Sequence, residues 1–148
     1  VLSRVIGLFA GRGYNIDSLT VAEVDHLGHR SRITIVTTGT PQIIVQIKAQ
    51  LGRFVDVHAV NDLTVEGPSV ERELALFKVT GLGNDRIEAI RLADIFRASV
   101  VDSTLESFVF ELTGTPEKID AFADLMRPLG LLEIARTGVA ALSRGAVA

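Results

Sequence analysis

A short motif occurs twice in this chain of 148 residues, and the two copies lie 75 residues apart. The sequence Thr38-Gly39-Thr40-Pro41 recurs as Thr113-Gly114-Thr115-Pro116. Apolar positions beside the two motifs match at the same spacing: Ile44 with Ile119, Ile47 with Phe122, Leu51 with Met126, and Val57 with Leu132. A fixed spacing that preserves apolar character without identity indicates one folding unit present twice. We therefore predict two units, although the length alone suggests a single domain.

The second copy predicts the element order βαββαβ. Alternating and β-branched residues predict strands over 73–80, 99–103 and 106–113, and a last strand over 131–142. A helical stripe of Ile87, Ile90, Ala93 and Phe96 predicts a helix over 85–97. Thr115 followed by Pro116 is typical of a capped helix start.

The first copy predicts the order αββαβ. We expect helices over 1–10 and 41–51 and strands over 15–24, 31–38 and 54–63. The strand that opens the second copy has no counterpart here, because its projected position lies before Val1. We therefore expect an opening strand and a βα turn ahead of the given sequence.

The repeated order βαββαβ with right-handed crossovers predicts an α+β fold of two ferredoxin-like units, with helices on one face of each antiparallel sheet. We place the units at 1–66 and 67–148. Units of this size have small cores, one bare sheet face and open edges, so they are expected to associate within the chain or between chains.

Composition excludes several classes of protein. The chain has no Cys, which rules out disulfides, thiolate metal sites and a Cys nucleophile. Its net charge of −3 and pI near 5.6 argue against nucleic-acid binding. Apolar runs reach only about four residues, far short of a membrane span. These features predict a cytoplasmic protein with no nucleic-acid or membrane partner.

Catalytic groups at a convincing spacing are not found. His26 and His29 form an HxxH pair, which fits a metal site but also a polar hairpin turn, and we favour the turn. The cluster Glu71-Arg72-Glu73 fits a proton relay less well than an ion pair at a strand entry. His58 is expected to be a surface or packed residue. The segment Gly11-Arg12-Gly13 follows a predicted helix, so it fits helix termination better than a phosphate loop.

The segment Gly13-Tyr14-Asn15-Ile16-Asp17-Ser18 leaves two interpretations open. Asn15 is typical of turn chemistry after a helix. It also fits recognition of a free amino acid, since an Asn oxygen accepts from an ammonium group while a helix N-terminus attracts a carboxylate. Aliphatic neighbours would then select an aliphatic side chain.

Several strings resemble the regulatory (small) subunits of acetolactate synthase, also called acetohydroxyacid synthase. The first ACT domain of that family is matched by 1–9 (VLSRVIGLF) and 12–21 (RGYNIDSLTV). The joint between domains resembles 70–76 (VERELAL), and the C-terminal domain resembles 93–97 (ADIFR), 133–138 (EIARTG) and 141–145 (ALSRG). The resemblance covers essentially the whole chain.

This resemblance implies a non-catalytic subunit that binds a thiamine-diphosphate-dependent catalytic (large) subunit, activates it and confers feedback inhibition by valine or another branched-chain amino acid. It implies a homodimer through the N-terminal ACT domain, with effector sites at that interface. The residues carried over are Val1 and Leu2 at the helix start of one protomer, and Asn15 and Ile16 of the other. It implies no cofactor on this chain, because thiamine diphosphate, Mg²⁺ and FAD belong to the catalytic subunit. The family's Asn- and Gly-containing turn before the helix is absent from the given sequence.

Two other hypotheses remain. One is a stand-alone amino-acid-sensing ACT protein that acts on a different partner. The other is an enzyme of ferredoxin-like fold, supported only by His26, His29 and scattered carboxylates.

Overall fold

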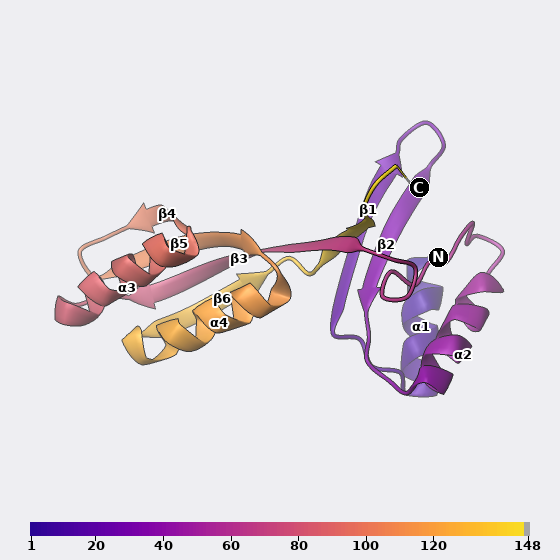
Figure 1. Cartoon of the computed structure of the whole chain (residues 1–148), viewed down its shortest axis with the longest axis horizontal. Coiled ribbons are helices and arrows are strands. Elements are labelled where there is room, and N and C mark those ends of the chain that lie inside the picture. The colour runs from indigo at the N-terminus through magenta and orange to yellow at the C-terminus, as the bar shows by residue number, and fades with distance from the viewer. Residues whose placement is uncertain (147–148) are drawn as a thin grey trace. The chain divides into compact units, whose positions relative to one another are not determined.

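The computed structural model describes residues 1–146 and consists of two compact units (Figure 1). The N-terminal unit comprises Val1–Val70 together with residues 139–146, and the C-terminal unit comprises Glu71–Gly138. This division differs from the predicted 1–66 and 67–148, because the last strand belongs to the first unit.

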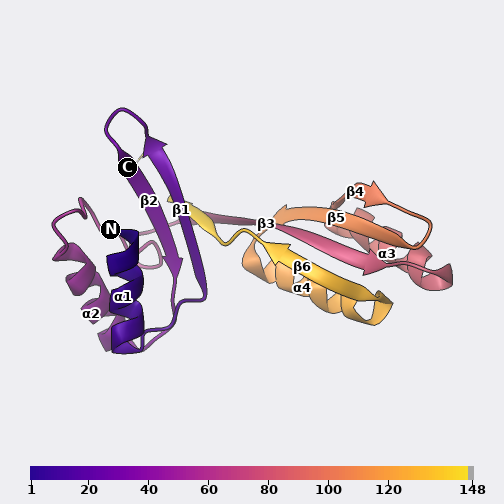
Figure 2. The ribbon, with the colours of Figure 1, turned by 180° about the vertical axis from the view of Figure 1, so that it is seen from behind.

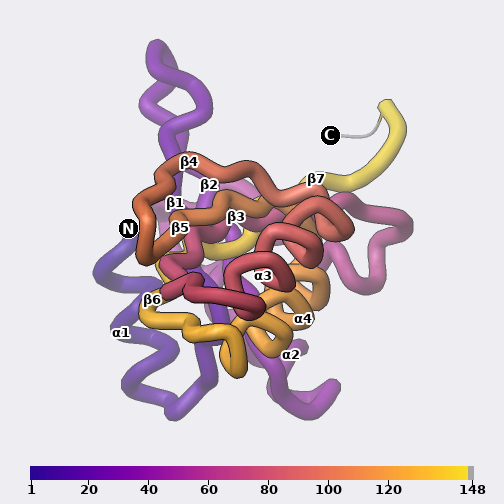
Figure 3. The backbone as a smooth tube through the Cα atoms, turned by 90° about the vertical axis from the view of Figure 1, so that its left-hand side faces the viewer, coloured from indigo at the N-terminus to yellow at the C-terminus, as the bar shows by residue number. Residues whose placement is uncertain are grey.

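The C-terminal unit has the predicted order βαββαβ. Its elements are β3 (Ser69–Thr80, which begins in the other unit), α3 (Gly83–Phe96), β4 (Ser99–Ser103), β5 (Ser107–Gly114), α4 (Pro116–Met126), the 3₁₀ turn η1 (Arg127–Leu129) and β6 (Leu131–Arg136). The strands lie in the order β4-β5-β3-β6, and all neighbours are antiparallel. Figures 2 and 3 show α3 and α4 side by side on one face of this sheet. The ferredoxin-like fold is thus confirmed.

The core of this unit is formed by side chains that alternate between the two faces of the sheet along β3 and β5. Every second residue of β3 and β5 faces the helices and is buried: Ala75, Phe77 and Val79 on β3, and Phe108, Phe110 and Leu112 on β5. The Phe122 ring of α4 lies 4.9 Å from the Phe77 ring and 6.0 Å from the Phe110 ring, both edge to face. These aromatic contacts fix α4 on the sheet.

The inward face of α3 differs from the predicted stripe. Ile87 is 68% exposed and Ile90 is 40% exposed, whereas Ala89 and Ala93 are buried. Two alanines on the inner face allow the helix backbone to approach the sheet closely. The prediction was thus right for Ala93 and for Phe96, which packs against the core, and wrong for Ile87 and Ile90, which lie on the outer side.

The helices α2 and α4 begin where the sequence predicts, whereas α1 extends to Arg12 and α3 begins at Gly83, two residues beyond the predicted bounds. Thr40 and Thr115 each accept a hydrogen bond at 3.3 Å, from the backbone N–H groups of Ile43 and Lys118, and each precedes a proline. The longest helix, α3, has 14 residues. Among residues 1–146, no helix combines the length and the apolar character needed to cross a membrane.

The N-terminal unit is built on a two-stranded sheet. It contains α1 (Leu2–Arg12), β1 (Ser18–Asp25), β2 (Arg30–Val36) and α2 (Pro41–Gly52). Ile33 and Ile35 of β2 face the helices, where Val5, Phe9 and Ile47 form the buried core. These three side chains are the buried part of the core on the helix side of the hairpin.

The predicted last strand, 131–142, is interrupted and forms β6 and β7 (Ala140–Ser143). Gly138 between them adopts a left-handed conformation with φ of 91°, which turns the chain out of β6. Residues 139–143 then join the N-terminal unit. The Val139 N–H donates to the Ser18 hydroxyl at 2.8 Å, and the Arg32 guanidinium donates to the Ala141 carbonyl at 2.9 Å.

This C-terminal strand covers the hairpin face opposite the helices. Ser18 and Arg32 project to the same face, since Ser18 pairs with Val36 and Arg32 with Ala22. Val139 and Ala141 are buried there. The hairpin therefore lies between two helices and a strand from the other end of the chain.

No strand forms over 54–63, where one was predicted. Residues 54–63 instead form turns and irregular backbone, and the prediction of a strand there was wrong. Local patterning alone does not form a strand, because the backbone N–H and C=O groups of a strand need a partner strand.

A buried carboxylate anchors β6 to β3. Glu73 is 5% exposed, and its two oxygens accept from Arg136 Nε and Nη2 at 2.8 and 2.9 Å. Arg136 Nη1 also donates to Asp120 at 2.6 Å. The hydrogen bond to Glu73 raises the pKa of Arg136 above its ordinary value, so the guanidinium stays charged at any pH at which the fold persists.

Replacing Arg136 with Ala should destabilise the C-terminal unit by about 3 kcal/mol, because Glu73 then becomes a buried, unpaired charge. Asp120→Ala is the matched control and should cost under about 1 kcal/mol, since that carboxylate is exposed. Hydrogen exchange of peptides within 71–138 measures both. Equal effects of the two substitutions would contradict the assigned role of Glu73.

Thr20 lies on the hairpin face beneath the C-terminal strand, and its hydroxyl is buried without a partner among residues 1–146. We expect Thr20→Val to be neutral or to stabilise the N-terminal unit by up to about 1 kcal/mol, because it removes an unpaired polar atom. Ser18→Ala should instead destabilise by about 1–3 kcal/mol, since the Val139 N–H loses its acceptor. Tyr14 is the single tyrosine, so its fluorescence in urea reports on this unit. Destabilisation by Thr20→Val would contradict this packing.

Candidate functional site

Asn15 lies in the connection between α1 and β1. Gly13, with φ of 70°, ends α1, and the Tyr14 N–H donates back to the Phe9 carbonyl at 2.9 Å. The segment Gly11-Arg12-Gly13 therefore terminates a helix, as the sequence favoured.

Hydrogen bonds hold the Asn15 side chain in one orientation. Its Nδ2 donates to Asp17 Oδ1 at 2.5 Å and to Thr38 Oγ1 at 3.3 Å. Because a carboxylate only accepts, the NH₂ group must face Asp17. The amide oxygen of Asn15 is then left as a free acceptor among the described residues. The Thr37 hydroxyl donates to the Asn15 backbone carbonyl, which ties this connection to the end of β2.

Ile16 is half-buried and packs against the core of Val5, Phe9 and Ile47. Its backbone position is thereby coupled to the helices. Thr37 and Thr38 were not among the predicted site residues, although Thr38 belongs to the repeated motif. Their contacts with Asn15 span 22 and 23 positions in sequence, so local patterns do not reveal them.

Val1 and Leu2 form the start of α1, and both are exposed. Val1 occupies the N-cap position, but its side chain makes no hydrogen bond to the backbone of the first turn. No acidic residue lies in that turn. The backbone N–H groups of that turn are therefore available to an anion.

The structure does not bring the four predicted effector residues together within one chain. Asn15 and Ile16 follow the C-terminal end of α1, whereas Val1 and Leu2 are at its N-terminal end. The helix has 11 residues, so its ends are about 16 Å apart at 1.5 Å per residue. A single small ligand can contact both pairs only if they come from two chains.

The histidine pair forms a polar turn. His26 Nδ1 lies 2.6 Å from Glu23 Oε1, and the Gly28 N–H donates to Asp25 Oδ1 at 3.1 Å. No group of three or more His, Asp or Glu side chains in residues 1–146 is arranged to hold a metal ion. His58 is exposed, and Glu73 is engaged by Arg136.

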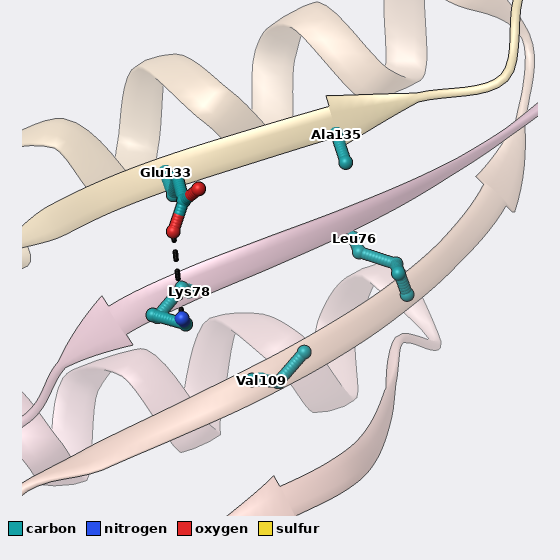
Figure 4. A pocket seen from close by; sticks show the side chains of 5 residues that line it. All are labelled: Leu76, Lys78, Val109, Glu133 and Ala135. Atoms are coloured by element: carbon teal, nitrogen blue, oxygen red, sulfur yellow. Dashed lines mark ion pairs between the residues drawn. The ribbon is translucent and has the colours of Figure 1, made fainter.

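A shallow hollow lies on the open face of the C-terminal sheet (Figure 4). It is lined by Leu76, Lys78, Val109, Glu133 and Ala135. Lys78 and Glu133 form an exposed ion pair at 3.4 Å. Its lining is mainly aliphatic, and its two charges neutralise each other.

Two family models match the chain. Residues 1–59 match the ACT domain of small subunits of acetohydroxyacid synthase, and residues 72–145 match the small subunit of acetolactate synthase. Together these matches span most of both units.

Curated relatives and a solved structure agree with these matches. The chain is 44% identical over 145 residues to a probable acetolactate synthase small subunit of Archaeoglobus fulgidus, covering 98% of this chain and 89% of that protein. It is 47% identical over 145 residues to the acetolactate synthase small subunit of Haemophilus influenzae, covering 97% and 88%. The crystal structure of the acetolactate synthase small subunit of Thermotoga maritima superimposes with a TM-score of 0.85 at 38% identity, covering 99% of this chain and 90% of that one.

Proposed function

Because the chain belongs to the acetolactate synthase small-subunit family, we propose that it activates a catalytic subunit and makes that subunit sensitive to valine or another branched-chain amino acid. The observation that carries this proposal is the similarity to small subunits along nearly the whole chain. The partner is the large subunit, which binds thiamine diphosphate, Mg²⁺ and FAD and performs the chemistry. This chain binds the large subunit and regulates its activity.

The chemistry of the two half-sites suits a free aliphatic amino acid. The uncapped start of α1 offers N–H donors and a positive helix end to the effector carboxylate. The free amide oxygen of Asn15 accepts from the ammonium group, and Asp17 holds that oxygen in place by binding the NH₂ group. Val1, Leu2 and Ile16 supply apolar surface for the side chain.

The separation of the half-sites supports a site shared between two protomers. Val1 and Leu2 of one protomer face Asn15 and Ile16 of the other, so the effector binds only the paired N-terminal units.

Inhibition requires two states of the regulatory dimer that the effector distinguishes. A difference in effector affinity of about 1–3 kcal/mol between them is typical of allosteric proteins. By linkage, a catalytic subunit that prefers one state changes effector affinity by the same amount.

Mixing the chain with an acetolactate synthase catalytic subunit tests the function. We expect a higher rate of acetolactate formation than with the catalytic subunit alone, and inhibition when valine is added. The isolated chain, assayed in parallel, should show no turnover. The proposal would be rejected if the chain neither activates the catalytic subunit nor makes it sensitive to valine. Capture of an unrelated partner would favour a stand-alone sensor.

Asn15→Ala tests the ammonium contact. Losing a hydrogen bond to a charged group costs about 1.5–3 kcal/mol, so valine binding should weaken roughly ten- to a hundredfold. Calorimetry on the full-length protein measures this, and Asn61→Ala, at an exposed asparagine outside the half-sites, is the matched control. Unchanged affinity of the Asn15 variant would remove this residue from the site.

A further inference from the structure

The Asn15 side chain is held by two neighbours of different hydrogen-bonding character. The Thr38 hydroxyl, 3.3 Å from Nδ2, both donates and accepts, so it holds the amide in place in either of two orientations. The Asp17 carboxylate, 2.5 Å from the same nitrogen, only accepts. Asp17 is therefore the residue that decides which end of the amide stays free, and that end is the oxygen.

The Asp17 carboxylate is fixed in position, and no cation neutralises it. Its backbone N–H donates to the Val36 carbonyl at 2.7 Å, immediately before the pairing of Ser18 with Val36 begins the β1–β2 ladder. Among residues 1–146, no cationic side chain pairs with Asp17, and Asn15 is its one side-chain partner. The free amide oxygen of Asn15 thus lies beside an uncompensated negative charge.

We propose that Asp17 is a positioning residue that makes the effector site selective for the amine of a free amino acid. The ligands that it rejects are 2-oxo acids with the same carboxylate and the same aliphatic side chain. This inference rests on the proposed function, because it concerns the site at which the effector binds. It adds the chemical group that the site distinguishes and the residue that makes the distinction.

Hydrogen-bonding character separates the two classes of ligand. An ammonium group donates to the Asn15 oxygen and is attracted by the Asp17 charge, whereas a 2-oxo group only accepts and meets two acceptors there. A site built for a donor rejects an analogue that lacks it, since the polar groups of the site are left unpaired. The apolar residues and the start of α1 do not make this distinction, because both classes carry the groups that bind there.

Asp17→Asn tests the assignment with a pair of ligands. The new amide both donates and accepts, so the Asn15 side chain becomes free to turn its NH₂ group toward the ligand. Calorimetry with valine and with 3-methyl-2-oxobutanoate, the 2-oxo acid that has the valine side chain, measures both affinities. We expect valine binding to weaken roughly tenfold and binding of the 2-oxo acid to strengthen, so the preference for valine falls by more than about tenfold.

Two further variants separate selectivity from a structural effect. Asp17→Glu keeps the acceptor and the charge, so it should retain most of the preference for valine. Asp102→Asn removes the same charge from an exposed position on β4, and both affinities should stay as in the unsubstituted protein. A purely structural role of Asp17 would weaken both ligands equally and leave the ratio of their affinities unchanged.

The proposal is overturned if the unsubstituted protein binds both ligands equally, or if Asp17→Asn keeps its preference for valine. It is also overturned if Asp17→Glu is as unselective as Asp17→Asn. Failure of the proposed function gives a different result, because the unsubstituted protein then binds no valine at all, and this inference falls with it. Valine binding with an unaltered preference in Asp17→Asn rejects the role of Asp17 alone.

Discussion

Burial of apolar side chains between helices and strands holds each of the two units of this chain together. The C-terminal unit packs four strands and two helices around a continuous aromatic and aliphatic core. The N-terminal unit has a hairpin, two helices and the C-terminal strand; Val5, Phe9 and Ile47 are buried on the helix side, and Val139 and Ala141 are buried on the other side. A two-stranded sheet is marginal by itself in water, so the hairpin depends on the surfaces that cover its two faces. One such surface is the C-terminal strand, which Ser18 and Arg32 bind on the face away from the helices.

A hairpin that depends on the surfaces around it is suited to regulation. A ligand or partner that adds contacts to one arrangement of such a unit shifts the population toward that arrangement. The proposed effector half-sites lie at the two ends of α1, the helix that carries Val5 and Phe9 of the small core. An effector bound between two protomers would thus contact a helix that carries part of the core of this unit. The C-terminal strand returns from β6 to this unit, so the chain itself connects the hairpin to the larger sheet.

The repeat predicted that one fold unit occurs twice. Thr40-Pro41 and Thr115-Pro116 also predicted two helix starts, because the capping hydrogen bonds there are local. The order of elements in the C-terminal unit followed from alternation and helical period. Long-range features escaped prediction. No strand forms over 54–63, the segment after Gly138 crosses to the other unit, and α3 buries Ala89 against the sheet while Ile87 is exposed. Around Asn15, the residue type suggested a role, but its orientation depends on Asp17 and Thr38, which only the tertiary structure brings to it.

The central claim is that the effector site is shared between two chains, and complementation tests it most directly. Asn15→Ala damages one half-site, and Leu2→Asp places a negative charge at the other, where it favours the helix but repels a carboxylate. Each variant alone should lose valine binding. In a random mixture, half of the dimers are mixed and each of those carries one intact site, so calorimetry should recover about one quarter of the sites at the parent affinity. Failure of the mixture to recover any such sites would contradict a site built from two protomers.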